Sequence, residues 1–165
     1  MDVVVIGGSA VTSHAPALYT SDDIDFAVLS GVRQREIAAS LAKLGFSRAG
    51  RSYAHPDLTF TLDFVADWPL IEAEPVKHFF KIETPFGPYD TLTVEDAIAD
   101  RVASFVHWND RQGLDVALAL AASTRERWGA ASLESALSVI DPGDAASSKR
   151  LRLACDLLIT SSSTL

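Results

Sequence analysis

The sequence predicts an α/β protein in which a β-sheet flanked by helices, residues 1–92, is followed by a helical C-terminal part, residues 93–165. In the first part, strand-like runs alternate with amphipathic helix patterns, whereas the second part shows helix patterns only. Apolar residues make up 48% of the chain and charged residues 22%, a composition typical of a compact folded protein. We therefore expect one sheet core with a helical part packed on it.

Alternation of apolar and polar residues identifies the strands. Residues 3–6 form a β-branched run that ends at Gly7-Gly8, which predicts a buried strand and a tight turn. In the next strand, a period of two places Asp23 and Asp25 on one face and apolar side chains on the other. Strands are predicted at residues 3–6, 21–28, 46–53, 58–65 and 79–83.

Apolar residues at helical spacing, together with capping and stop residues, identify the helices. Ser9 predicts the N-cap of a first helix that Pro16 can end, with His14 partly exposed on it. Thr93 and Asp96 have the spacing of a capping box at the start of the helical part. Helices are predicted at residues 10–18, 32–44, 93–107, 113–123, 132–140 and 145–160.

Composition excludes several classes of protein. The single cysteine, Cys155, cannot form an internal disulfide or a cysteine-rich zinc site. No apolar run approaches the ~20 residues that span a bilayer, and no basic segment precedes the first apolar run as it would in a signal peptide. We therefore expect a cytoplasmic protein without membrane contact.

The balance of charges favours cations over nucleic acid as ligands. Fourteen basic and 22 acidic residues give a formal net charge of −8. This charge opposes extensive contact with a phosphate backbone but is compatible with a site that collects cations. The mean hydropathy of +0.16 is high for so charged a chain, which favours an apolar face covered by a protein partner or a second copy of the chain.

The turn at Gly7-Gly8-Ser9 is a candidate phosphate site. A strand leads directly into a helix there, so backbone N–H groups and the positive end of the helix dipole can face an anion. Glycine lets the anion approach the backbone because it has no Cβ atom. On its own, however, such a turn more often joins a strand to a helix without binding anything.

Three carboxylates are candidate metal ligands. Asp23 and Asp25 have Cα atoms ~6.5–7 Å apart on one strand face, and Asp63 joins them if its strand lies beside theirs. Close carboxylates repel one another unless a cation neutralises them, and oxygen ligands without histidine or cysteine suit Mg²⁺ or Mn²⁺. Together with the glycine turn, these acids predict phosphoryl or nucleotidyl transfer. A metal-dependent phosphohydrolase fits the acids but not the turn followed closely by Asp-x-Asp.

The order of these motifs resembles that of the nucleotidyltransferase superfamily, whose fold is that of DNA polymerase β. The resemblance lies within residues 3–65 and rests on Ile6-Gly7-Gly8-Ser9, Asp23-Ile24-Asp25-Phe26 and Asp63. Two later segments, residues 92–96 and 110–115, look like the helical part of small bacterial members, which include the toxin-type enzymes of abortive-infection systems.

The resemblance implies a mixed sheet flanked by helices, two Mg²⁺ ions and a nucleoside triphosphate (NTP) substrate. Asp23 and Asp25 would hold the metal ions. Asp63 would bind the catalytic metal ion or act as general base towards an acceptor hydroxyl. The glycine turn would bind the triphosphate, with Gly8 and Ser9 in contact with it.

The sequence departs from the family pattern at two points. Arg101 stands where small relatives often carry a lysine, and it is either a phosphate-binding cation or a structural cation that bridges to Asp96 or Asp100. Members often have a helix before the first strand, and none precedes Val3. We expect either that the start has been placed too late or that another chain covers that face of the sheet.

The sequence thus predicts a nucleotidyltransferase that moves a nucleoside monophosphate from an NTP to an acceptor hydroxyl. Transfer RNA or another RNA, a small molecule and a protein are all candidate acceptors, and a toxin-like role is compatible with each. The alternative is a catalytically inactive protein of the same fold that acts by binding a partner, as in a toxin–antitoxin pair.

Overall fold

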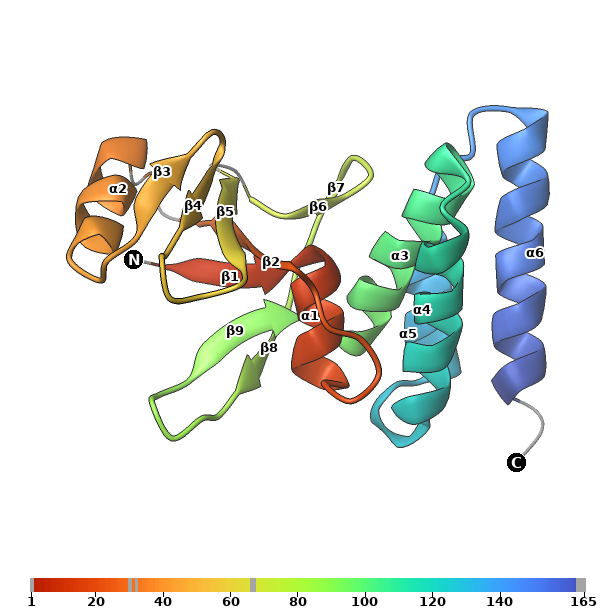
Figure 1. The fold of residues 1–165 in the computed structure, drawn as a ribbon. Helices are drawn as coiled ribbons and strands as arrows, with labels where there is room; N and C mark the ends of the chain where they lie inside the picture. The colour runs from red at the N-terminus through yellow and green to blue at the C-terminus, as the bar shows by residue number, and fades with distance from the viewer. Residues whose placement is uncertain (1, 30, 32, 66–67, 163–165) are drawn as a thin grey trace.

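The computed structural model describes residues 2–29, 31, 33–65 and 68–162, and it confirms a mixed sheet followed by a helical part (Figure 1). The strands are β1 (Val3–Ile6), β2 (Asp23–Val28), β3 (Ser47–Ala49), β4 (Ser52–Ala54), β5 (Thr61–Val65), β6 (Leu70–Ile71), β7 (Glu74–Pro75), β8 (Phe79–Ile82) and β9 (Tyr89–Leu92). The α-helices are α1 (Gly7–His14), α2 (Gln34–Ala42), α3 (Val94–Trp108), α4 (Arg111–Ser123), α5 (Ala130–Leu137) and α6 (Ala145–Ser162), with a 3₁₀ helix η1 (Arg125–Arg127).

Seven strands form one sheet in the order β3-β4-β5-β2-β1-β9-β8. Strand β1 is antiparallel to the central strand β2 and parallel to β9, and β2 is parallel to β5. Strands β6 and β7 form a separate hairpin. Because β1 runs directly into α1, the start of that helix lies at the same edge of the sheet as the first residues of β2 and β5 (Figure 1).

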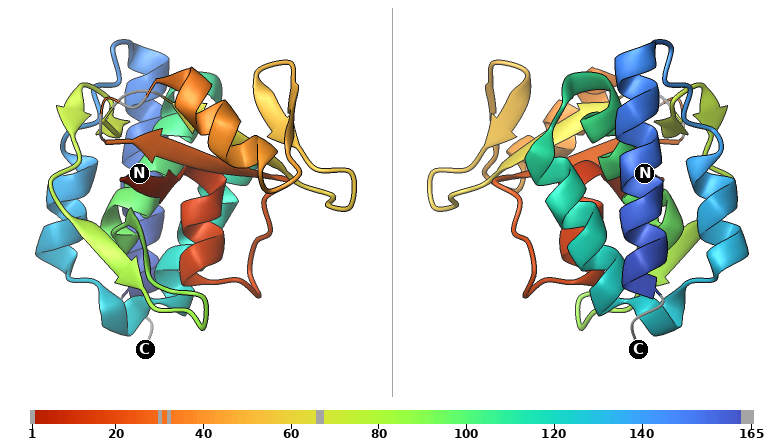
Figure 2. Two further views of the ribbon diagram at one scale, coloured as in Figure 1. Left: turned by 90° about the vertical axis from the view of Figure 1, so that its left-hand side faces the viewer. Right: turned by 90° about the vertical axis from the view of Figure 1, so that its right-hand side faces the viewer.

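Helix α2 covers part of one face of the sheet. Its buried residues Ile37 and Leu41 pack with Val28 of β2 and with Tyr53 and Leu62 of the neighbouring strands. Period two in β2 puts Asp23 and Asp25 on the opposite face from these apolar contacts. The hairpin of β3 and β4 extends away from the body of the molecule (Figure 2).

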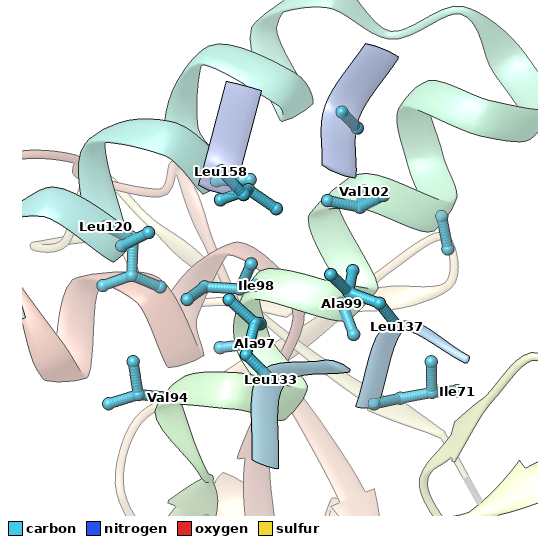
Figure 3. Packing of buried hydrophobic residues seen from close by; sticks show 14 of the residues in the cluster. Ile71, Val94, Ala97, Ile98, Ala99, Val102, Leu120, Leu133, Leu137 and Leu158 are labelled. Carbon is cyan, nitrogen blue, oxygen red and sulfur yellow. The ribbon is translucent and has the colours of Figure 1, made fainter. Parts of the chain in front are cut away.

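The larger hydrophobic core surrounds α3. Figure 3 shows its side chains enclosed by Leu120 of α4, Leu133 of α5 and Leu158 of α6. Ile98 in the middle of α3 has no exposed surface, so its replacement by alanine costs about 2–5 kcal/mol in stability. Residues of α1 and β9 belong to the same core. Packing within this core therefore fixes the position of α3 relative to the sheet.

The predicted strands differ from the observed ones in four places. The strand at 21–28 begins only at Asp23. The weak strand at 46–53 is the hairpin of β3 and β4, because Gly50 takes a φ of +67° and allows a two-residue turn. The strand at 58–65 begins only at Thr61, since the N–H of Leu58 bonds to the carbonyl of His55 in a turn. Strand β9 and the hairpin of β6 and β7 were not predicted, because their few residues show no regular alternation.

The helices match their predicted positions more closely. Helix α1 ends at His14, before Pro16, but it begins at Gly7, so the prediction of Ser9 as its N-cap is wrong. Thr93 does cap α3: its Oγ1 accepts a bond from the Asp96 N–H at 3.1 Å. The predicted helix at 32–44 is α2, and residue 32 lies outside the described residues, as do residues 163–165 of the helical part.

Candidate active site

The three predicted carboxylates meet on one face of the sheet. Asp25 of β2 and Asp63 of β5 are direct partners in the parallel register of these strands, and Asp23 lies two residues earlier on the same face. One carboxylate oxygen from each residue lies within 4.8 Å of the other two. The pairing of β2 with β5, on which the prediction of a cluster depended, is therefore confirmed.

The cluster is rich in negative charge. Burial, followed by the neighbouring charges of Asp23 and Asp63, raises the pKa of Asp25 to about 6, although Arg101 opposes this shift. Within the described part of the chain, the buried Oδ1 of Asp63 has no hydrogen-bond partner. A divalent cation would supply the partner that this oxygen lacks and would neutralise the repulsion, so the residues fit a site for a hard metal ion.

The glycine turn lies directly against this cluster. Gly7 has a φ of +60°, which favours glycine, and a Cβ atom built on it would lie 2.6 Å from Oδ2 of Asp25. The N-cap residue of α1, Ile6, makes no side-chain hydrogen bond to the helix, and the first turn of α1 contains no acidic residue. The first N–H groups of α1 are thus placed beside the carboxylates and are suited to an anion.

The hydroxyl of Ser9 makes a hydrogen bond within the protein. Ser9 is buried, and its Oγ donates a 2.7 Å hydrogen bond to the backbone carbonyl of Asp23. This bond ties α1 to the start of β2. What Ser9 can offer to a phosphate is therefore its backbone N–H rather than its side chain.

Ser21 is a site residue that the sequence analysis missed. Its Oγ donates a 2.8 Å hydrogen bond to Oδ1 of Asp23 and so orients that carboxylate. Its position two residues before Asp23 is the only signal in the sequence, and serine is too common in loops for that signal to be specific.

Arg101 of α3 lies within electrostatic range of Asp25, and its guanidinium is held by hydrogen bonds on its own helix. Its Nε and Nη2 donate to Oδ2 of Asp100 at 3.0 and 2.6 Å, so of the two predicted acidic partners it pairs with Asp100. Burial lowers the pKa of Arg101, but Asp100, Tyr19 and Asp110 outweigh this effect and raise it overall. A permanent positive charge therefore lies near Asp25, whether or not it contacts a phosphate.

Comparison with known proteins begins with two negative results: neither a protein-family model nor a curated protein matches the chain. Solved structures do match. The antibiotic-resistance factor ANT(2'')-Ia, known from its solution structure, superposes with a TM-score of 0.52 and 20% sequence identity over 84% of this chain and 80% of that one. The chain has a nucleotidyltransferase fold.

A second structure with this nucleotidyltransferase fold is the antigenic nucleotidyltransferase-like protein from Paracoccidioides brasiliensis. It matches with a TM-score of 0.51 and 14% identity over 92% of this chain and 84% of that one. The fold implied by the sequence motifs is thus confirmed. The toxin-like role, the acceptor and a protein partner stay predictions, and none of the helices in the described ranges is long and apolar enough to span a membrane.

Proposed function

We propose that this chain is a divalent-metal-dependent nucleotidyltransferase that moves a nucleoside monophosphate from an NTP to an acceptor hydroxyl. The observation that carries the proposal is the meeting of Asp23, Asp25 and Asp63 within 4.8 Å, beside the open N-terminus of α1. The unpartnered Oδ1 of Asp63 supports it, because a buried carboxylate oxygen without a donor is expected where a cation binds.

The three aspartates would hold Mg²⁺ or Mn²⁺, and the glycine turn would hold the triphosphate. When bound, the metal would neutralise phosphate charge and orient the reacting groups. The N–H groups at the start of α1 would fix the phosphates, and Arg101 would add positive charge on the side of α3. The acceptor oxygen attacks the α-phosphorus, the bond to the β-phosphate breaks, and pyrophosphate leaves.

We assign Asp63 to the metal site; the alternative role for its carboxylate is to receive the acceptor proton. Its Oδ1 is free of hydrogen bonds within the described residues, so a lone pair is available for a proton. The protein then contributes mainly position and charge, which is the usual basis of catalysis in phosphoryl transfer. RNA, small-molecule and protein hydroxyls are all compatible with this chemistry as acceptors.

Transfer of label tests the proposal. The protein is incubated with total cell extract, Mg²⁺ or Mn²⁺, and each of the four NTPs labelled at the α- or the γ-phosphate. We expect the α-label from one or more NTPs to enter an RNA, small-molecule or protein fraction, while the γ-label is released as pyrophosphate. Asp25→Asn should abolish transfer, and the control Asp57→Asn, which changes an exposed loop carboxylate, should not. NTP binding without transfer would favour the inactive binding protein.

A further inference from the structure

Tyr19 lies against the second glycine of the turn. A Cβ atom built on Gly8 would lie 3.0 Å from Cε1 and 3.2 Å from the hydroxyl oxygen of Tyr19. The backbone here is fixed to α1, because Thr12 Oγ1 donates to the carbonyl of Tyr19 at 3.1 Å and the N–H of Leu18 bonds to Ala15 at 2.9 Å. The fold therefore places the phenol beside the first turn of α1.

The Tyr19 side chain has an apolar environment around its ring and a polar one around its hydroxyl oxygen. Its ring packs against the larger hydrophobic core, and its oxygen lies within electrostatic range of the Arg101 guanidinium. Among the described residues, no hydrogen bond joins the Tyr19 hydroxyl to another group. In contrast, the hydroxyl of Tyr89 donates to Ser13 Oγ at 3.1 Å. Tyr19 thus has an O–H donor that no described residue accepts, and the Arg101 guanidinium lies within electrostatic range of it.

The two glycines of the turn have different neighbours. Gly7 faces the carboxylate of Asp25, where a metal ion would bind, and Gly8 faces both Tyr19 and the hydroxyl of Ser21, which donates to Asp23. An anion at the start of α1 would therefore have Asp25 beside Gly7 and the phenol beside Gly8. A phenylalanine would fill the same space against Gly8, so packing alone does not account for the hydroxyl.

We propose that Tyr19 is a substrate-binding residue whose hydroxyl donates a hydrogen bond to a phosphate oxygen of the triphosphate. This inference rests on the proposed function, since it requires an NTP at the glycine turn. It assigns Tyr19 to the phosphates rather than to the base, the sugar or the acceptor. It follows that the contact is the same for every NTP and also for inorganic tripolyphosphate.

Isothermal titration calorimetry with the full chain tests this assignment. Magnesium tripolyphosphate and the magnesium complexes of the four NTPs are titrated into the wild type, Tyr19→Phe and the control Tyr89→Phe. We expect Tyr19→Phe to bind tripolyphosphate and NTP more weakly by the same factor, roughly tenfold, because its lost bond is to a charged partner. Tyr89→Phe should bind both as the wild type does, since its hydroxyl contacts Ser13.

Nitration of tyrosine in the wild type provides a second measurement that needs no variant. Mass spectrometry would show that magnesium tripolyphosphate slows nitration of Tyr19 and leaves that of Tyr89 unchanged. Equal affinities of Tyr19→Phe and the wild type, or a loss of affinity for the NTPs but not for tripolyphosphate, would overturn the phosphate-binding role of Tyr19. Neither result would affect the proposed function. A wild type that binds neither tripolyphosphate nor any NTP would overturn the proposed function together with the role of Tyr19.

Discussion

Asp25 and Asp63 face each other across the parallel strands β2 and β5, as direct partners in the register. With Asp23 they concentrate three carboxylates within 4.8 Å, and burial together with this crowding raises the pKa of Asp25 to about 6. Without a cation, repulsion among these carboxylates lowers the stability of the folded protein. The cluster is therefore expected to serve a function rather than stability.

Replacement of Asp25 by asparagine should stabilise the metal-free protein at neutral pH. The raised pKa means that the folded state holds this proton more tightly than the unfolded state, so the ionised group destabilises the fold above a pH of about 6. We expect the free energy of unfolding at pH 7.5 to rise by about 1–2 kcal/mol, allowing for solvent screening. The gain should shrink as the pH falls to 4.5.

Urea denaturation in the presence of a chelator, at both pH values, measures this gain. The control Asp57→Asn changes a carboxylate whose side chain is 86% exposed, so the free energy of unfolding should stay unchanged at both pH values. Equal stability of the wild type and Asp25→Asn at pH 7.5 would contradict the destabilising effect of the ionised Asp25 on the folded state.

Alanine at Gly7 should damage the site more than alanine at another glycine with the same backbone conformation. Gly7 and Gly143 have φ values of +60° and +67°. Among the described residues, a new Cβ at Gly7 meets Oδ2 of Asp25 at 2.6 Å, whereas one at Gly143 meets no atom within 4 Å. Gly143→Ala should cost about 1–2 kcal/mol from the backbone alone. Gly7→Ala should cost more and also weaken Mn²⁺ binding. Thermal unfolding and metal titration of both variants decide this, and equal losses would contradict the close approach to Asp25.

Removal of the Ser21 hydroxyl should weaken the metal site without unfolding the protein. Ser21 orients Asp23 through a 2.8 Å bond, and loss of a group that orients a ligand lowers metal affinity by roughly tenfold. Mn²⁺ titration of Ser21→Ala measures the loss. Ser138→Ala, which removes an exposed bond to the carbonyl of Ser135, is the matched control. A Ser21→Ala protein with wild-type affinity would exclude this role.

His14 should make the fold sensitive to acid, with the opposite sign to Asp25. Its Nε2–H donates to the carbonyl of Leu92 at 2.8 Å, and its Nδ1 accepts from Arg127 at 2.8 Å, which requires the neutral ring. Burial lowers the pKa of His14 below 6.5, so the unfolded state binds the proton more readily and stability falls as the pH drops below that value.

Comparison of Asp25→Asn with the double variant Asp25→Asn, His14→Gln isolates this effect, because Asp25 no longer titrates. Between pH 7.5 and 5, the stability of the single variant should fall more steeply than that of the double variant. The double variant should also be less stable at pH 7.5, by about 1–3 kcal/mol for the lost buried hydrogen bonds. Parallel pH profiles would show that His14 is not held neutral.

The sequence predicted those parts of the site that depend on local pattern. Alternation in residues 23–28 separated Asp23 and Asp25 from the apolar face, and the glycines after β1 marked the turn into α1. The meeting of Asp63 with this pair depended on β5 lying beside β2, a long-range pairing that the order of family motifs implied but that periodicity alone could not determine.

Other features arise only from the folded arrangement. The contact between Tyr19 and Gly8 depends on the path of the loop that connects α1 to β2, and no spacing in the sequence encodes it. His14 was expected to be partly exposed, but it is buried because β9, which the sequence analysis missed, supplies the carbonyl of Leu92 as its partner. Short segments without alternation therefore hid both a strand and the environment of a histidine.

Electron paramagnetic resonance of Mn²⁺ measures whether the three aspartates hold the divalent cation used with an NTP. Free Mn²⁺ is measured during titration of the wild type, Asp63→Asn and Asp57→Asn, with and without NTP. We expect NTP to tighten Mn²⁺ binding to the wild type and to Asp57→Asn, whereas Asp63→Asn should bind the ion at least about tenfold more weakly in both conditions. Equal Mn²⁺ affinity of Asp63→Asn and the wild type would contradict this expectation.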